Sequence, residues 1–264
     1  MNKTALSLAA LVASAVQAHA LEDVVDVDFL HGWRESDGHH YAGVTITLAE
    51  GWKTYWRAPQ GAGIPPVFTV LEHSNLDTMQ MEFPKPMMLE DFGEKVLGYK
   101  DQVTLPLIFK THVEDAPTKI AAELRIGVCS DICIPVKYTV AVELPPTGQE
   151  GAQVIKAAMK TGPSKPEQHG ISKVDCQLSP DGKTTTMSSV FSWPSAEMPM
   201  ISVVEYPSDA VWVAPVKASV DGSTMTLTTE LKNYGSSNFI ERDKIKLSVL
   251  TDNHIFEFNG CSSS

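Results

Sequence analysis

The stretch Ile120–Leu144, IAAELRIGVCSDICIPVKYTVAVEL, decides the fold class. Apolar side chains occupy every second position in both halves, namely Ile120, Ala122, Leu124 and Ile126, then Ile134, Val136, Tyr138, Val140, Val142 and Leu144. Because successive side chains of a strand point to opposite faces, this alternation predicts two strands that flank a turn. Cys129 and Cys133 lie in the turn, so we expect both cysteines at the tip of a hairpin.

Short alternating runs of the same kind recur along the chain. They are Val44–Leu48 and Val103–Ile108 before the hairpin, and Val211–Val213 and Met225–Leu227 after it. The dipeptides Asp181-Gly182 and Asp221-Gly222 are typical of turns between paired strands. Long helical periodicity is absent. The pattern predicts an all-β protein with two tandem immunoglobulin-like β-sandwich domains.

Composition suggests where the chain divides. Residues 1–20 have the pattern of a signal peptide, and residues 21–146 are expected to form the first sandwich. Residues 147–170 are rich in proline and glycine around a short possible helix at Val154–Met159, and we interpret them as a linker. Residues 171–264 are expected to form the second sandwich.

The amino terminus indicates the compartment. Lys3 supplies a positive charge, Ala5–Val16 is apolar, and Ala18-His19-Ala20 fits a cleavage site with small flanking residues. No run after residue 21 approaches the 18 apolar residues of a transmembrane helix. We therefore expect a mature chain that is secreted into the periplasm and is not inserted in the membrane.

Charge and motifs exclude several classes of function. The formal net charge of the chain is -11, which argues against nucleic acid or an anionic membrane as a partner. The sequence has neither the Gly-x-Ser-x-Gly motif of a serine hydrolase nor a glycine-rich phosphate loop. We expect no cofactor and no resident metal.

The spacing of the four cysteines suggests two pairs. Bridging Cys129 to Cys133 closes a very short loop, which contributes only about 2 kcal/mol in the chain-entropy model. Bridging Cys176 to Cys261 closes a loop of 85 residues, which contributes about 4 to 5 kcal/mol and suits a structural disulfide. Pairing Cys129 with Cys176, or Cys133 with Cys261, is the alternative arrangement.

The close pair allows three interpretations. It could be a structural hairpin disulfide, or half of a metal site, although structural zinc needs four ligands and no second pair of cysteines or histidines is near in sequence. The third interpretation, which we favour, is a redox-active dithiol, because exchange requires an accessible bridge that a partner thiolate can attack.

Three stretches resemble the periplasmic N-terminal domain of the thiol:disulfide interchange family of DsbD and its relative ScsB, a copper-tolerance protein. They are Gly51–Arg57, Asp91–Pro106 and Gly127–Pro135. The spacing of the cysteines is shorter than in DsbD, which favours the ScsB-like branch. The resemblance covers most of residues 21–146, and the second half is similar only to the longer ScsB-type region.

The resemblance implies an immunoglobulin-like domain with a thiol:disulfide oxidoreductase activity of the protein-disulfide reductase type. Its partners would be thioredoxin-like periplasmic proteins and, because this sequence ends at Ser264, a separate membrane-embedded thiol reductase as the electron source. Cys133 would form the mixed disulfide and Cys129 would resolve it. Asp91, Phe92 and Gly93 match a cap loop whose aromatic side chain shields the disulfide.

An alternative function is a copper-handling or protein-binding module whose disulfides are purely structural. His39 and His40, together with Met79, Met81, Met87 and Met88, offer the ligands of a soft copper site. Methionines more often fill gaps in a core. The aromatic cluster Trp52, Tyr55 and Trp56 could line a docking surface, but we expect it in the core.

Overall fold

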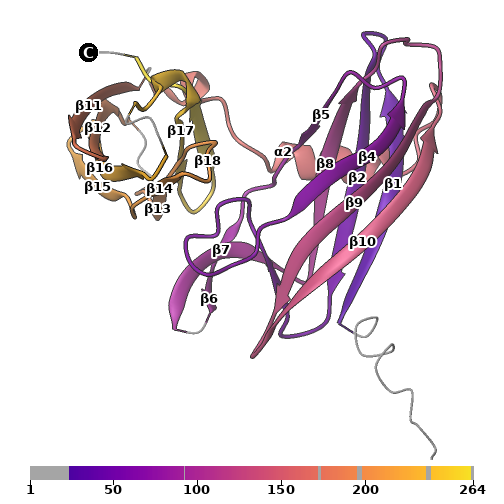
Figure 1. Ribbon diagram of the computed structural model, residues 1–264, viewed down its shortest axis with the longest axis horizontal. Helices are drawn as coiled ribbons and strands as arrows, with labels where there is room; N and C mark the ends of the chain where they lie inside the picture. The colour runs from indigo at the N-terminus through magenta and orange to yellow at the C-terminus, as the bar shows by residue number, and fades with distance from the viewer. Residues whose placement is uncertain (1–23, 92, 172–173, 195–197, 236–238, 263–264) are drawn as a thin grey trace, which may run out of the picture.

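The computed structural model describes residues 24–91, 93–171, 174–194, 198–235 and 239–262 (Figure 1). The expected signal peptide, residues 1–20, lies outside these ranges, and so does Phe92 of the expected cap loop. Within the described ranges, no helix has both the length and the apolar character needed to cross a membrane.

The first sandwich contains the strands β1 to β10. They are β1 (Val25–Arg34), β2 (His39–Leu48), β3 (Lys53–Tyr55), β4 (Val67–Ser74), β5 (Thr78–Met81), β6 (Met87–Asp91), β7 (Glu94–Lys100), β8 (Gln102–Lys110), β9 (Thr118–Cys129) and β10 (Cys133–Leu144). One sheet has the order β1-β2-β8-β5, and the other has the order β10-β9-β3-β7-β6, with β4 also paired to β9. The pairs are antiparallel, as short hairpin connections require.

The hairpin predicted from the sequence forms one side of this sandwich. Strands β9 and β10 pair over their whole length, with Ile120 opposite Val142 and Leu124 opposite Tyr138. Leu124 and Ile126 of β9 are buried in the same cluster as Leu105 of the facing sheet. The alternation seen in the sequence therefore reflects a core between two sheets.

The second sandwich contains the strands β11 to β18. They are β11 (Asp175–Asp181), β12 (Thr184–Ser192), β13 (Ile201–Glu205), β14 (Val211–Val213), β15 (Lys217–Asp221), β16 (Thr224–Asn233), β17 (Lys246–Leu250) and β18 (Ile255–Asn259), with a short 3-10 helix η2 (Arg242–Lys244) before β17. Its sheets have the orders β11-β12-β16-β14, with β15 on β16, and β13-β17-β18. Trp193 and Phe256 are buried between them. The fold is thus all-β, with two tandem immunoglobulin-like sandwiches.

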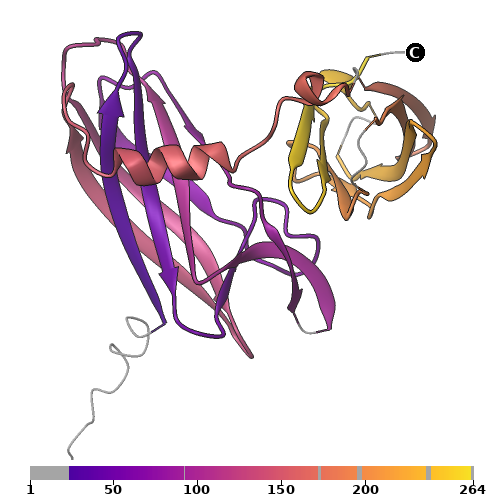
Figure 2. The ribbon, with the colours of Figure 1, turned by 180° about the vertical axis from the view of Figure 1, so that it is seen from behind.

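Helix α2 (Ala152–Lys160) lies between the two sandwiches in sequence and crosses β1, β2 and β8 of the first one (Figure 2). Its buried residues Ala152 and Ile155 form a small cluster with Trp33. The Lys156 ammonium lies 4.5 Å from the centre of the Trp33 ring. The chain then passes through a 3-10 helix, η1 (Pro166–His169), into the second sandwich.

Side chains of the two sandwiches pack against one another. Val203 and Ile255 of the second sandwich belong to the buried cluster that fills the first. Arg57, which follows β3, donates to both carboxylate oxygens of Glu205 over 2.9 to 3.2 Å and is also paired with Glu257. Its guanidinium lies 4.2 Å over the Trp56 ring. The end of β3 is thereby held by both sandwiches.

Candidate functional site

The tip of the β9–β10 hairpin carries a disulfide between Cys129 and Cys133. The two residues lie directly opposite one another at the last pair of the ladder, and their Cα atoms are 4.1 Å apart. Side chains at such opposite positions point to the same face of a sheet. The Ser130 amide donates to the Ile132 carbonyl at 3.0 Å across the turn. The hairpin geometry therefore brings the two sulfurs together.

The two cysteines differ in access to solvent. Cys129 is fully buried, whereas Cys133 is exposed. Ile132, beside Cys133 at the tip, is 61% exposed. Cys133 is therefore the more accessible of the two bridged residues.

Strand β3 lies next to β9 and contributes to the same face. Lys53 is directly opposite Cys129, so its side chain and that of Tyr55, two residues later, share the face of the disulfide. Tyr55 forms a buried cluster with Cys129, Leu89 and Val96. This cluster lies on one side of the sheet. The main core, in which Trp56 is buried, lies on the other side.

A glycine-rich loop covers Tyr55. A Cβ atom on Gly63 would collide with the Tyr55 ring, and a Cβ on Gly127 would lie 2.7 Å from the Cβ of Ile64. The Gly127 amide donates to the Ile64 carbonyl at 3.2 Å. The absence of side chains at these two glycines therefore lets the loop approach β9 and close over the Tyr55 ring, which is fully buried.

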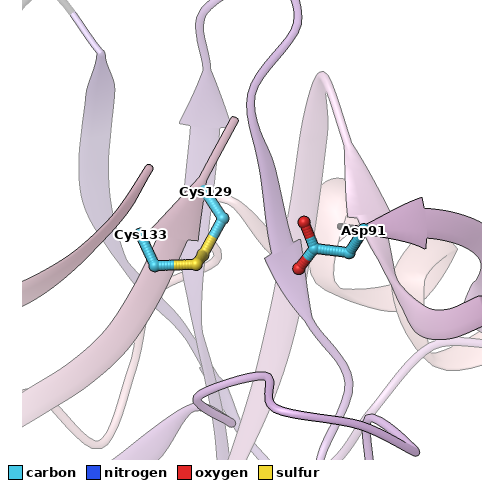
Figure 3. Close-up of side chains that lie close together, drawn as sticks. All are labelled: Asp91, Cys129 and Cys133. Atoms are coloured by element: carbon cyan, nitrogen blue, oxygen red, sulfur yellow. A yellow bond between two sulfur atoms is a disulfide. The ribbon is translucent and has the colours of Figure 1, made fainter. Parts of the chain in front are cut away.

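Asp91, the last residue of β6, completes the site (Figure 3). Its carboxylate points toward the two sulfurs, and one oxygen of it lies within 4.8 Å of both. The Tyr55 hydroxyl donates to Oδ2 of Asp91 and lies 3.5 Å from the Cys133 Sγ. The Lys53 Nζ is 2.9 Å from Oδ1. That contact lacks hydrogen-bond geometry, so Oδ1 accepts no hydrogen bond from the described residues.

The electrostatics of the site hold Tyr55 in its neutral form. Burial, the hydrogen bond to Asp91 and the negative charge of Asp91 all raise the pKa of Tyr55 far above its ordinary value. The phenol therefore keeps its proton and directs it to Asp91. Its oxygen lone pair remains free to accept a hydrogen bond from Cys133 once that residue is a thiol.

The site residues could also be considered as metal ligands. Asp91, Cys129 and Cys133 place three potential ligand atoms close together. In the disulfide, however, the sulfurs are not thiolates and do not bind metal in that form. The Lys53 ammonium beside the carboxylate also disfavours a second cation. The site fits thiol chemistry better than metal binding.

The proposed histidine and methionine ligands for copper do not gather at one place. The Nδ1 of His39 lies 2.9 Å from the Asp37 carboxylate, and His40 is buried, with Nε2 2.6 Å from the His31 carbonyl. The four methionines are divided between β5 of one sheet, with Met79 and Met81, and β6 of the other, with Met87 and Met88.

The remaining cysteines form the second disulfide, Cys176–Cys261, with 5.5 Å between the Cα atoms. Cys176 is buried in the core of the second sandwich. The bridge links the start of β11 to the residue two positions after β18. It therefore joins the first and the last strand segments of the second sandwich in sequence.

Two residues of the site were not recognised as such in the sequence. Tyr55 is expected in the core in preference to a docking surface, and Lys53 is named only within the stretch Gly51–Arg57. The available signal was their spacing of two, which places both on one face of a strand. Of the expected cap loop, Asp91 contacts the site, and Gly93 has a φ of 82° in the turn between β6 and β7. Such a φ favours glycine.

Comparison with known proteins shows what this geometry is similar to. Residues 22–145 match the family model described as thiol:disulfide interchange protein DsbD, N-terminal. None of the curated proteins compared with the chain matches it.

The solved structures that match the chain include N-terminal domains of ScsB and DsbD. The N-terminal periplasmic domain of ScsB from Proteus mirabilis aligns with a TM-score of 0.65 and 19% identity, over 92% of this chain and 95% of that one. The reduced N-terminal domain of DsbD from Neisseria meningitidis aligns with a TM-score of 0.29 and 18% identity, over 47% of this chain and 89% of that one. The sandwich that carries the Cys129–Cys133 disulfide thus belongs to the family of DsbD N-terminal domains, within a chain that has the fold of the ScsB periplasmic domain.

Proposed function

We propose that this protein exchanges thiols and disulfides in the periplasm, relaying reducing equivalents from a membrane-embedded thiol reductase to thioredoxin-like proteins. The observation that carries the proposal is the unequal access of the two bridged cysteines. Cys133 is exposed and Cys129 is fully buried, as expected for an attacked sulfur and its resolving partner. The DsbD family match over residues 22–145 supports the same chemistry.

Reduction of the protein begins at Cys133. A donor thiolate attacks the Cys133 sulfur, the bond to Cys129 breaks, and Cys129 leaves as a thiolate that takes up a proton. The second thiol of the donor then attacks the donor sulfur of the mixed disulfide and releases Cys133. The donor is oxidised to a disulfide, and the pair of cysteines gains two electrons and two protons.

Delivery to a client reverses the sequence. The Cys133 thiolate attacks a client disulfide, and Cys129 then attacks the Cys133 sulfur, which restores the bridge and releases the reduced client. Ionisation of Cys133 needs a proton acceptor. Tyr55 contacts both Cys133 and Asp91, so the proton can pass to the Tyr55 oxygen while the proton of Tyr55 passes to Asp91.

The same contacts protect the reduced pair at rest. The negative charge of Asp91 opposes formation of a second negative charge on a nearby sulfur, and the Tyr55 oxygen can accept a hydrogen bond from the Cys133 thiol. Cys129 is fully buried and packs with Tyr55, Leu89 and Val96. A thiol held in this way reacts slowly with small oxidants, because the thiolate is the reactive form.

Trapping of a mixed disulfide tests the proposal. The Cys129→Ser variant leaves the exposed Cys133 without its resolving partner, and we expect it to accumulate a mixed disulfide with a thioredoxin-like protein whose own resolving cysteine is replaced. The Cys133→Ser variant leaves only the buried Cys129 and should trap at least tenfold less. The double variant Cys176→Ser/Cys261→Ser is the control for the other disulfide. Failure of Cys129→Ser to trap the partner would contradict the relay.

The reduction potential separates a relay from a purely structural disulfide. Thiol counting by mass spectrometry across a dithiothreitol redox series should show Cys129 and Cys133 titrating together above about −300 mV, the usual limit for structural bridges. Cys176 and Cys261 should resist reduction to that limit. If both pairs resist, the protein is a binding module with structural disulfides.

A further inference from the structure

Lys53 is a buried lysine beside the disulfide that the exchange steps above do not use. It is 8% exposed, lies opposite Cys129 in the sheet, and places its ammonium 2.9 Å from the Asp91 carboxylate. Lysine is almost never buried without a partner, because its charge loses hydration. Its burial at the start of β3, opposite the end of β9, therefore needs an explanation.

Stability alone is a poor explanation for the pair of Lys53 and Asp91. Removing two charges from water costs about as much as their attraction returns, and apolar residues of similar size often serve a fold equally well. Leu89 and Val96, which form the cluster around Tyr55, are apolar. Apolar side chains in place of Lys53 and Asp91 would enlarge that cluster and would bury no charge. A function in the site's chemistry accounts for the retained pair.

The charges around the sulfurs make Lys53 the cation of the site. Asp91 from β6 and Tyr55 from β3 face the cysteines. The other charged groups of β6, β7 and the hairpin tip are exposed to solvent, namely Glu90, Glu94, Lys95, Lys100 and Asp131. The half-buried Glu123 of β9 lies six residues before Cys129 and is paired with Lys137. Solvent screens the exposed groups far more than it screens a buried pair.

We propose that Lys53 is the counter-ion of the redox site, a positioning residue whose ammonium balances whichever of Asp91 and Cys133 carries the negative charge during exchange. The inference rests on the proposed function and names a further residue of the same site. Before attack, Asp91 is the anion and Cys133 is a thiol. When the proton moves through Tyr55 to Asp91, the carboxylate becomes neutral and the negative charge resides on the Cys133 sulfur. One buried cation serves both states.

The pH profile of Cys133 alkylation tests this inference. The reduced protein reacts with iodoacetamide, an uncharged reagent, and mass spectrometry follows the modification of Cys133 from pH 6 to 10. Lys53→Met removes the cation and should slow the reaction at pH 7 about tenfold, which corresponds to a shift of the profile by about one pH unit. Lys53→Arg keeps a cation and should restore most of the rate.

Lys100→Met is the matched control. Lys100 lies directly opposite Lys53 on the other neighbouring strand, and it is exposed. The change removes the same formal charge, but screening by water should keep the alkylation rate within about twofold of the original protein. An equal effect of both substitutions would indicate a response to net charge and would overturn the assignment to Lys53.

A second comparison avoids the buried, unpaired carboxylate that Lys53→Met creates. In the Asp91→Asn background the amide is neutral and water takes up the proton of Cys133. Without the opposing carboxylate charge, and with the Lys53 cation still present, alkylation should be faster than in the original protein. The double variant Lys53→Met/Asp91→Asn should then react about tenfold more slowly than Asp91→Asn alone. Equal rates for these two variants would show that Lys53 has only a structural role. The assay needs no partner protein, so its outcome is independent of the trapping experiment.

Discussion

Replacing Tyr55 by phenylalanine should destabilise the oxidised protein by about 1.5 to 3 kcal/mol. The substitution removes a single oxygen from a fully buried ring, and the ring keeps its contacts with Leu89, Val96 and Cys129. The lost interaction is a hydrogen bond to the carboxylate of Asp91. Hydrogen bonds to charged groups contribute about 1.5 to 3 kcal/mol, and the buried acceptor would be left without a donor.

Tyr99→Phe provides the matched control for Tyr55→Phe. Tyr99 is also buried, lies opposite Thr54 on the adjacent strand, and donates to the Pro84 carbonyl at 2.7 Å. Loss of this bond to a neutral acceptor should cost about 1 kcal/mol. Both values come from urea unfolding of the oxidised proteins at pH 7. A cost for Tyr55→Phe no larger than that of Tyr99→Phe would refute a bond to an ionised Asp91.

The pH dependence provides a second check on Tyr55. Because the folded-state pKa of Tyr55 is raised, the folded protein holds this proton more tightly than the unfolded chain does. The contribution of Tyr55 to stability is complete below the unfolded value of about 10 and is lost as the pH rises through the folded value. The difference in unfolding free energy between the original protein and Tyr55→Phe should therefore shrink above about pH 10.

Three further changes test other parts of the structure. Burial lowers the pKa of His40 to about 4. The contribution of neutral His40 to the free energy of unfolding is therefore complete above about pH 6.5. That contribution should be lost as the pH falls toward 4, by about 3 kcal/mol in total, and His40→Gln should abolish this part of the acid dependence in urea unfolding. Arg57→Met removes the ion pair of Glu205 and leaves Glu257 only the Lys246 ammonium, 3.9 Å away. It should cost about 2 to 4 kcal/mol in calorimetry, with only part restored by Arg57→Lys. Replacing Cys176 and Cys261 by serine should lower the stability of the second sandwich by about 4 to 5 kcal/mol and leave trapping at Cys133 unchanged.

The fold class could be predicted from the sequence because it depends on local alternation. The run from Ile120 to Leu144 has a period of two in both halves, and the structure pairs these halves in register as β9 and β10. The Asp-Gly dipeptides also predict turns at Gly182 and Gly222. In the structure both glycines adopt a φ near 60° between paired strands. Such signals act over a few residues and survive in any tertiary context.

The candidate site was only partly accessible to the same reasoning. The close cysteines and Asp91 could be named, the latter through the family resemblance. The contacts among Lys53, Asp91 and the cysteines depend on long-range pairing, because β3 lies between β9 and β7. No local pattern specifies this strand order. The methionines named as copper ligands are separated for the same reason, since β5 and β6 are near in sequence yet belong to different sheets.

The segment Lys53–Arg57 shows why a sequence pattern can be interpreted correctly and still mislead. Aromatic residues at positions 55 and 56 indicated core packing, and both side chains are indeed fully buried. Because neighbours on a strand point to opposite faces, however, Trp56 enters the main core whereas Tyr55 contacts the Cys133 sulfur. Arg57 then reaches across to Glu205 of the second sandwich. Burial alone does not distinguish a residue of the main core, such as Trp56, from a residue of the redox site, such as Tyr55. The face of the strand on which the side chain lies makes that distinction.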